Sequence, residues 1–98
     1  MSEVAFSENE LLGKVILVGF TYYTADDEFV ERKQFCGEVF KVLENTIWLR
    51  QKDGSEFSIP NDQEAIEDAP EGEYTLRSTG EVVVNPDYLS TWNITMTD

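Results

Sequence analysis

The chain contains no histidine, a single cysteine and three prolines, and its seven basic residues face twenty acidic ones, which gives a formal charge of −13. Histidine is the side chain whose ordinary pKa suits acid–base catalysis near neutral pH, so the most common catalytic base is missing. Cys36 has no companions for a zinc site and no partner for a disulfide within the chain. We therefore expect a protein that is not an enzyme, holds no metal or cofactor, and keeps Cys36 as a buried, unreactive thiol.

Long apolar segments are also missing, since the longest run is residues 15–20 even when Gly19 is counted. A membrane-spanning helix needs about 20 apolar residues. The first six residues, MSEVAF, have neither the basic region nor the apolar stretch of a signal peptide. These features predict a cytoplasmic protein that does not enter a membrane, and the lone cysteine agrees with a reducing compartment.

Negative charge is distributed unevenly along the chain. Residues 53–98 hold eleven acidic side chains and one basic side chain, Arg77, whereas residues 1–52 hold nine acidic and six basic side chains. Few Lys and Arg residues are present to displace phosphate counterions, so the charge disfavours binding to nucleic acid. We expect a basic protein or peptide as the partner, although acidity that serves only solubility explains the same numbers.

What is present suffices for a folded chain. Hydrophobic residues make up 41% and aromatic residues 12% of the 98 positions. This apolar content separates the chain from acidic disordered sequences. We expect residues 1–98 to form a single small domain.

Residues 14–23 (KVILVGFTYY) are rich in β-branched and aromatic side chains, which predicts a strand buried over much of both faces. We expect it to be the central strand of the fold. The next ten residues, 24–33, are polar and charged except for Phe29 and Val30. They predict a long excursion with an acidic tip, either as a loop or as two extended arms folded onto the barrel wall.

Three further strands are predicted as a meander over residues 34–44, 46–51 and 56–59. Gly37 suits a bulge or tight bend in the first of them. The Asp53-Gly54 pair favours a type I′ turn between the other two.

Short helical turns and a final hairpin complete the prediction. Residues 7–13 begin with the S-x-x-E spacing of a capping box, and Asn61-Asp62 precedes a segment long enough for one helical turn. Residues 73–78 and 81–84 predict a hairpin, and residues 88–96 predict an edge strand.

This order predicts an all-β fold with the connectivity of SH3-like small barrels. We expect an SH3-like (Sm-like) barrel of five to seven strands, with a short N-terminal helical turn and one helical turn before the last strands.

Local strings add family resemblances. LLGKV at residues 11–15 and FCGEV at residues 35–39 resemble the start of an Sm-like domain, a likeness that covers residues 7–50. In that family an aspartate and an asparagine after the second strand bind RNA; here Glu44-Asn45 stands at that place. The later Arg-Gly motif of the family is missing.

Two other strings resemble known groups. Residues 59–62 (IPND), after Trp48, are similar to the Ile-Pro-Ser-Asn-Tyr segment of peptide-binding SH3 domains, with Asp62 in place of the tyrosine. Residues 72–83 resemble a segment of small bacterial β-proteins of unknown function. These resemblances imply topology, and they imply a groove for proline-rich ligands only where the aromatic residues are kept.

Two acidic segments and one tryptophan are the candidate partner-binding residues. The first segment is the predicted loop tip, which lacks the spaced ligands of an EF-hand loop, and the second lies in residues 62–73, where six acids occur without a base. Acidic runs of this kind are also typical of solvated turns. Trp48 is expected to point away from the core between Ile47 and Leu49, either as an exposed anchor for a partner or packed under the C-terminal segment. The candidates are Asp26, Asp27, Glu28, Trp48, Asp62, Glu64, Glu67 and Asp68.

The sequence thus predicts a non-catalytic protein-binding module with an acidic face, for which an immunity-type inhibitor of a basic toxin or nuclease is one concrete form. Two alternatives stay open. One is a structural subunit that assembles through strand edges, as Sm-like rings do, and the other is an Sm-like RNA-binding protein.

Overall fold

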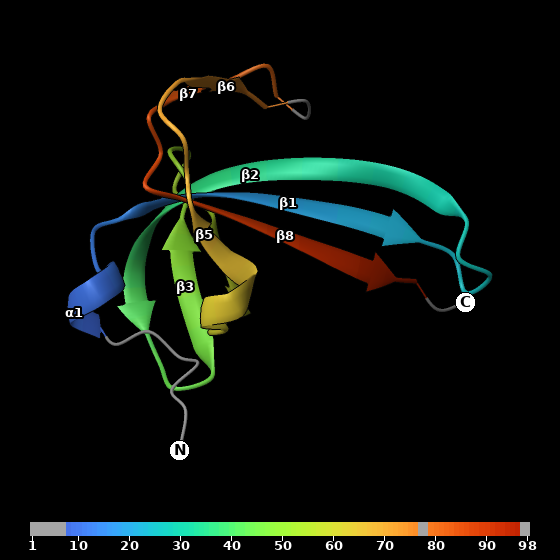
Figure 1. Ribbon diagram of the computed structural model, residues 1–98, viewed down its shortest axis with the longest axis horizontal. Coiled ribbons are helices and arrows are strands. Elements are labelled where there is room, and N and C mark those ends of the chain that lie inside the picture. Colours follow the sequence, from blue (N-terminus) through green and yellow to red (C-terminus); the bar gives the residue numbers. More distant parts are fainter. Residues whose placement is uncertain (1–7, 77–78, 97–98) are drawn as a thin grey trace.

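A computed structural model of the protein describes residues 8–76 and 79–96 (Figure 1). The fold is all-β. Its two helical pieces are single turns, α1 (Glu8–Leu11) and the 3-10 turn η1 (Gln63–Ala65), and no helix in the described ranges is long and apolar enough to cross a membrane. The strands are β1 (Val15–Tyr23), β2 (Phe29–Val42), β3 (Thr46–Arg50), β4 (Glu56–Pro60), β5 (Ile66–Asp68), β6 (Glu73–Thr75), β7 (Val82–Val84) and β8 (Tyr88–Thr95).

Six of the strands form one sheet in the order β4-β3-β2-β1-β8-β5, and β6 and β7 form a separate two-stranded sheet. The predicted barrel of five to seven strands is wrong. The described residues form eight strands, and among them β4 and β5, the two ends of the large sheet, do not pair with each other. A barrel requires that closure.

The central position predicted for residues 14–23 is confirmed, because β1 lies between β2 and β8. Ile16, Leu17 and Val18 are all buried, so both faces of the first half of β1 are covered. The excursion predicted for residues 24–33 is confirmed in part. Residues 29–33 are extended, but they belong to β2 and pair with β1, with a register shift between Tyr22 and Tyr23, and the loop is confined to residues 24–28. The charged side chains of Glu31, Arg32 and Lys33 are compatible with a strand because they are exposed to solvent.

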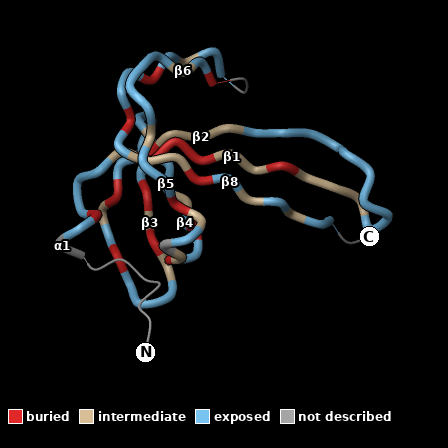
Figure 2. Tube along the Cα trace, viewed as in Figure 1, coloured by how far each residue is buried: buried red, intermediate tan, exposed pale blue. Residues whose placement is uncertain are grey.

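The core has two parts, which appear as red segments in Figure 2. The larger lies on the concave side of the large sheet and the smaller lies between β1 and the β6–β7 hairpin, where Leu17, Leu76 and Val83 are buried together. The larger part consists of Leu11, Ile16, Val18, Val39, Val42, Ile47, Leu49, Ile59 and Ile66. The predicted final hairpin is therefore present and forms a small second layer.

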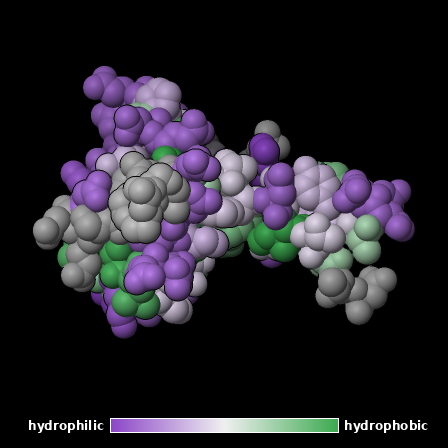
Figure 3. Space-filling model, turned by 60° about the horizontal axis from the view of Figure 1, so that its bottom comes forward, coloured by the Kyte–Doolittle hydropathy of each residue, from purple (hydrophilic) through white to green (hydrophobic). Residues whose placement is uncertain are grey.

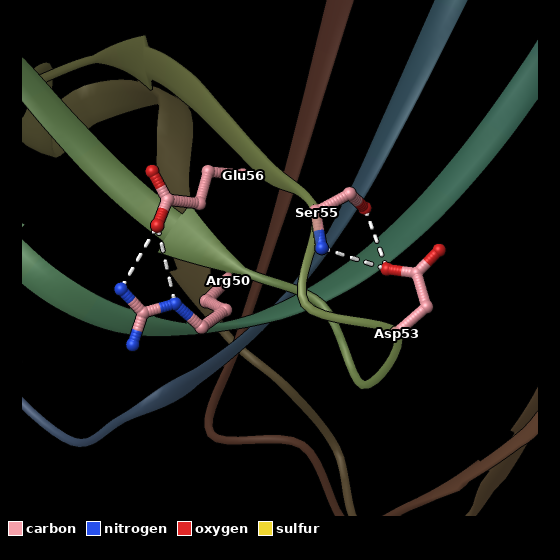
Figure 4. Close-up of polar contacts among 4 residues, drawn as sticks. All are labelled: Arg50, Asp53, Ser55 and Glu56. Carbon is pink, nitrogen blue, oxygen red and sulfur yellow. Dashed lines mark hydrogen bonds and ion pairs between the residues drawn. The ribbon is translucent and has the colours of Figure 1, made fainter.

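The β3–β4 turn carries the predicted Asp53-Gly54 pair, and Figure 4 shows Asp53 and Ser55 in this turn. It is not a type I′ turn. The N–H of Gln51 donates to the Ser55 carbonyl at 2.8 Å and the N–H of Gly54 donates to the Gln51 carbonyl at 2.9 Å. Only Gly54 has a positive φ, of 91°, whereas type I′ needs two such residues. The hydroxyl and N–H of Ser55 donate to Asp53 Oδ1 at 2.6 and 2.9 Å and lower the pKa of Asp53.

The edge strand predicted at residues 88–96 is confirmed only for its second half. β8 runs parallel to β1 over eight residues, from the Ile16–Tyr88 pair to the Tyr23–Thr95 pair. On its other side, β5 pairs only with the first three residues of β8. β8 therefore lies beside the central strand, and only its second half is at an edge.

Gly37 is buried just before Glu38, where the pairing of β2 with β3 begins. A Cβ atom on Gly37 would lie 2.8 Å from Leu49 Cβ and 3.3 Å from the Arg50 carbonyl oxygen. The bulge predicted at this glycine lies instead between Val39 and Lys41. Gly37 thus serves a close approach between strands.

Gly37→Ala should lower the free energy of unfolding by about 1–3 kcal/mol, because the added methyl group overpacks against backbone-linked atoms. Gly19→Ala is the matched control, since its Cβ would meet nothing closer than Thr91 Oγ1 at 3.9 Å. Urea denaturation of both variants measures the difference. Equal stabilities of the two variants would contradict this account of Gly37.

Candidate functional site

The second halves of three strands leave the body of the protein as a single-layer sheet (Figures 1 and 2). We call residues 19–23 of β1, 29–35 of β2 and 91–95 of β8 the three-stranded extension. In Figure 1, β3 and β5 lie at the opposite end of the molecule from the tip of the extension, and the β6–β7 hairpin lies above the sheet. Figure 3 shows apolar surface on the extension beside hydrophilic side chains at its end.

One face of the extension is aromatic. Alternate residues of a strand share one face, so Phe20 and Tyr22 lie on the same face of β1 as the buried Ile16 and Val18. The face that is buried in the body thus continues into the extension. The ring of Phe20 lies 5.8 Å from that of Phe35 and 6.5 Å from that of Tyr22. On β8, Trp92 is the residue paired with Phe20. These aromatic side chains are only half-buried, which is typical of residues that anchor protein interfaces.

Trp92 carries the one buried side-chain nitrogen or oxygen atom without a hydrogen-bond partner in the described part of the chain. Its indole Nε1 is buried and has no acceptor there. An unmade hydrogen bond of this kind costs roughly 1–3 kcal/mol. The aromatic face is therefore not optimised for the stability of the isolated chain, as is common at binding sites.

The predicted acidic tip is a compact turn at the end of the extension. The hydroxyl of Thr24 accepts the N–H groups of Asp26 and Glu28 at 3.2 and 3.1 Å. Asp27 adopts a φ of 67°. All three acidic side chains are exposed, and none forms an ion pair within the described residues. This turn therefore presents three uncompensated carboxylates on an ordered backbone.

The second acidic segment lies on the body. The carboxylate of Asp62 accepts the N–H of Glu64 at 3.0 Å and so caps η1. Glu64, on η1, is exposed, as are Glu67 and Asp68 on β5, which pair with Leu89 and Tyr88 of β8. Asp62 is half-buried and acts as a capping residue, whereas the other three are free to meet a partner.

The structure does not bring all the predicted residues together. Trp48 is half-buried on β3, on the side opposite the fully buried Ile47 and Leu49, as its alternation predicts. It lies between Lys41 and Ser58 on the neighbouring strands of the body, away from the extension. The expected single acidic face is in fact two acidic groups, one on the body and one at the tip (Figure 1).

A cleft of about 310 Å³ lies beside Cys36, and its side chains are poorly suited to binding an ion or to nucleophilic attack. Its basic groups are compensated, since Arg50 pairs with Glu56 at 2.9 Å and Lys52 pairs with Glu81 at 3.3 Å. Burial, and then the charge of Glu81, raise the pKa of the half-buried Cys36 thiol to about 11. The thiol is therefore protonated at neutral pH and is a poor nucleophile. Across residues 8–76 and 79–96, no group of three metal-binding side chains is assembled.

The aromatic face was not predicted as a site. Its residues belong to strands whose apolar sequences are typical of core segments. Their pattern does not indicate that the strands are fully covered only as far as Val18. One signal was visible: residues 88–96 contain no charged side chain, in a chain where 28% of residues are charged. Such a segment is suited either to burial or to contact with a partner.

No protein-family model, curated protein or solved structure matches this chain. The resemblances to SH3-like and Sm-like domains therefore rest on local strings, and the open sheet does not have the closed form that they imply.

Asp27→Gly should raise the free energy of unfolding by about 0.5–1 kcal/mol, because Asp27 occupies a left-handed conformation that glycine adopts without steric cost. The Thr24–Glu28 turn has the same two hydrogen bonds as the β3–β4 turn, where Gly54 takes the equivalent place. Asp26→Gly is the control and should be destabilising, since Asp26 has no positive φ. Thermal or urea unfolding that ranks the two variants the other way would contradict this interpretation.

Alkylation of Cys36 by iodoacetamide should be about a hundredfold slower at pH 8 than for a thiol with the ordinary pKa, since a pKa near 11 lowers the thiolate fraction by two powers of ten. The neutral thiol contributes stability below the unfolded pKa of 9.0, and this contribution is lost as the pH rises toward 11. The pH profile of the alkylation rate measures the pKa. A midpoint near 9, or no downward shift in Glu81→Gln, would contradict the stated causes.

Proposed function

We propose that this protein is a non-catalytic binding module for a basic protein or peptide, and that the three-stranded extension is its binding element. The observation that supports it best is the single-layer sheet of the extension (Figure 1), whose aromatic face is only partly covered by the core and by Phe57 of β4 and which ends at an acidic turn. Small sheets in water normally cover one face with a second layer. A partner is the natural covering for the aromatic face of the extension.

The charges of the extension favour a basic partner. Of its two cations, Lys33 lies 3.8 Å from the carboxylate of Glu31, whereas the Nε of Arg32 donates to the neutral hydroxyl of Thr21 at 3.3 Å. The carboxylates of the tip have no such compensation among the described residues. A cationic partner is thus attracted both by the carboxylates of the tip and by the net charge of −13.

The aromatic face itself is suited to cations. The Nζ atom of Lys33 lies 5.8 Å from the centre of the Tyr22 ring. Lysine or arginine side chains of a partner would make the same kind of contact with the neighbouring rings. An immunity-type inhibitor that occludes a basic toxin or nuclease is one concrete form of such a module.

Affinity capture from native extract tests the proposal. We expect the protein to retain basic proteins at about 0.05 M NaCl and to release them at about 0.5 M, where exposed charges are screened within a few ångströms. Neutralising the tip with D26N, D27N and E28Q should lower the recovery at least tenfold, because the local field is removed.

The matched control is the triple variant E44Q, E71Q and E73Q, which changes the net charge equally at exposed positions outside the candidate residues. It should retain most of the recovery. Absence of any basic protein at both salt concentrations contradicts the proposed function. Equal losses in the two triple variants would show that net charge, rather than the extension, governs binding.

A further inference from the structure

The second half of β8 has an open backbone edge. β5 covers β8 only from Tyr88 to Ser90, and within the described residues no strand pairs with Thr91–Thr95 on the side away from β1. Every second residue of an edge strand leaves its N–H and C=O unpaired on that side. The edge is about 16 Å long, since a strand rises about 3.3 Å per residue.

This edge lacks the protection that exposed edges usually carry. Proteins commonly guard such strands with charged residues, lysine above all, or with proline. The opposite edge of the extension follows this rule, because β2 carries Glu31, Arg32 and Lys33 there. β8 has the sequence YLSTWNIT, with neither charge nor proline. The unprotected edge is therefore the one suited to accept another strand.

Acidic side chains lie at both ends of the open edge. At its start, Glu67 pairs with Leu89, and the hydroxyl of Ser90 donates to the Ala65 carbonyl at 2.9 Å, which places Glu64 close to the first residue of β5, Ile66, opposite Ser90. At its end, the N–H of Met96 donates to the Tyr23 carbonyl at 2.7 Å, next to the turn that holds Asp26 and Asp27. An uncharged strand edge thus runs between two negative groups.

We propose that Thr91–Thr95 of β8 receives an extended segment of the partner by strand addition, and that this segment carries basic side chains before and after a short uncharged stretch. The inference rests on the proposed function and specifies its binding mode. Backbone hydrogen bonds hold the added strand to β8. Its flanking cations meet Glu64, Glu67 and Asp68 at one end and Asp26, Asp27 and Glu28 at the other.

A second copy of this chain is a poorer occupant of the same edge. An antiparallel pairing of two β8 strands would place the acidic tip of each copy against Glu67 and Asp68 of the other. A parallel pairing would place like groups side by side. Both arrangements oppose uncompensated carboxylates, which is destabilising.

Three versions of one peptide test the inference. The probe is KRTVTVTRK with blocked ends, which has cations at both ends and an uncharged β-forming centre. The second version is N-methylated at alternate central residues, so that one of its edges stays intact, and the third is N-methylated at every central residue. All three keep the same charges and side chains, and fluorescence anisotropy measures their binding at about 0.05 M NaCl.

We expect the first two peptides to bind alike and the fully methylated peptide to bind at least tenfold more weakly, because it has no N–H edge to offer. Amide hydrogen exchange should slow in Thr91–Thr95 on binding and stay unchanged in residues 29–35 of β2. The triple variants D26N/D27N/E28Q and E64Q/E67Q/D68N should each weaken binding several-fold. E44Q/E71Q/E73Q should leave it nearly unchanged.

Equal binding of all three peptides would overturn strand addition while leaving a charge-driven binding module in place. Strand addition is also overturned if none of the peptides binds although basic proteins are captured through the tip. If neither peptides nor basic proteins bind, the proposed function fails as well. Slowed exchange in Thr91–Thr95 that grows with protein concentration, without peptide, would replace the partner with a second copy.

Discussion

Parallel pairing between β1 and β8 is the constraint on which the rest of the structure depends. It joins the two ends of the chain, and it is anchored at its start by a reciprocal contact. The N–H of Val15 donates to the Asp87 carboxylate at 2.8 Å, and the N–H of Asp87 donates to the Val15 carbonyl at 2.9 Å. A contact across 72 residues carries a large loop-closure cost, so it is stable only because the eight paired residues and the core beneath them offset that cost.

This pairing also decides the form of the sheet. With β8 beside β1, the short β5 strand can cover only the beginning of β8, and the sheet ends there instead of closing on β4. The remainder of β8 then accompanies β1 and β2 outward as the third strand of the extension. The extension and its open edge are therefore consequences of one non-local pairing.

The body and the extension differ in how they are stabilised. In the body, Ile16, Leu17 and Val18 are covered on both faces of β1, whereas beyond Phe20 the aromatic side chains are only partly covered. Ring contacts between Phe20, Phe35 and Phe57 extend the core toward the extension, but they leave these side chains partly exposed. Surface of this kind lowers the stability of the isolated chain, and it is retained where contact with a partner covers it.

The amino-acid sequence by itself determined most of the local structure. Apolar alternation and turn residues located β1, β3 and the β6–β7 hairpin, because these depend on neighbours close in the chain. The net negative charge and the absence of histidine are properties of the composition and do not depend on the fold. Exposure of Asp26, Asp27 and Glu28 followed from their place in a turn between two strands.

Only the tertiary structure decided where β8 lies, that the sheet stays open, and that the acidic residues form two groups at the ends of an uncharged edge. The pattern in residues 88–96 suits an edge strand or a central strand equally, since both alternate in the same way. The choice between them depends on which distant strand offers the better pairing and burial. That information lies in contacts between the two ends of the chain, which no local pattern encodes.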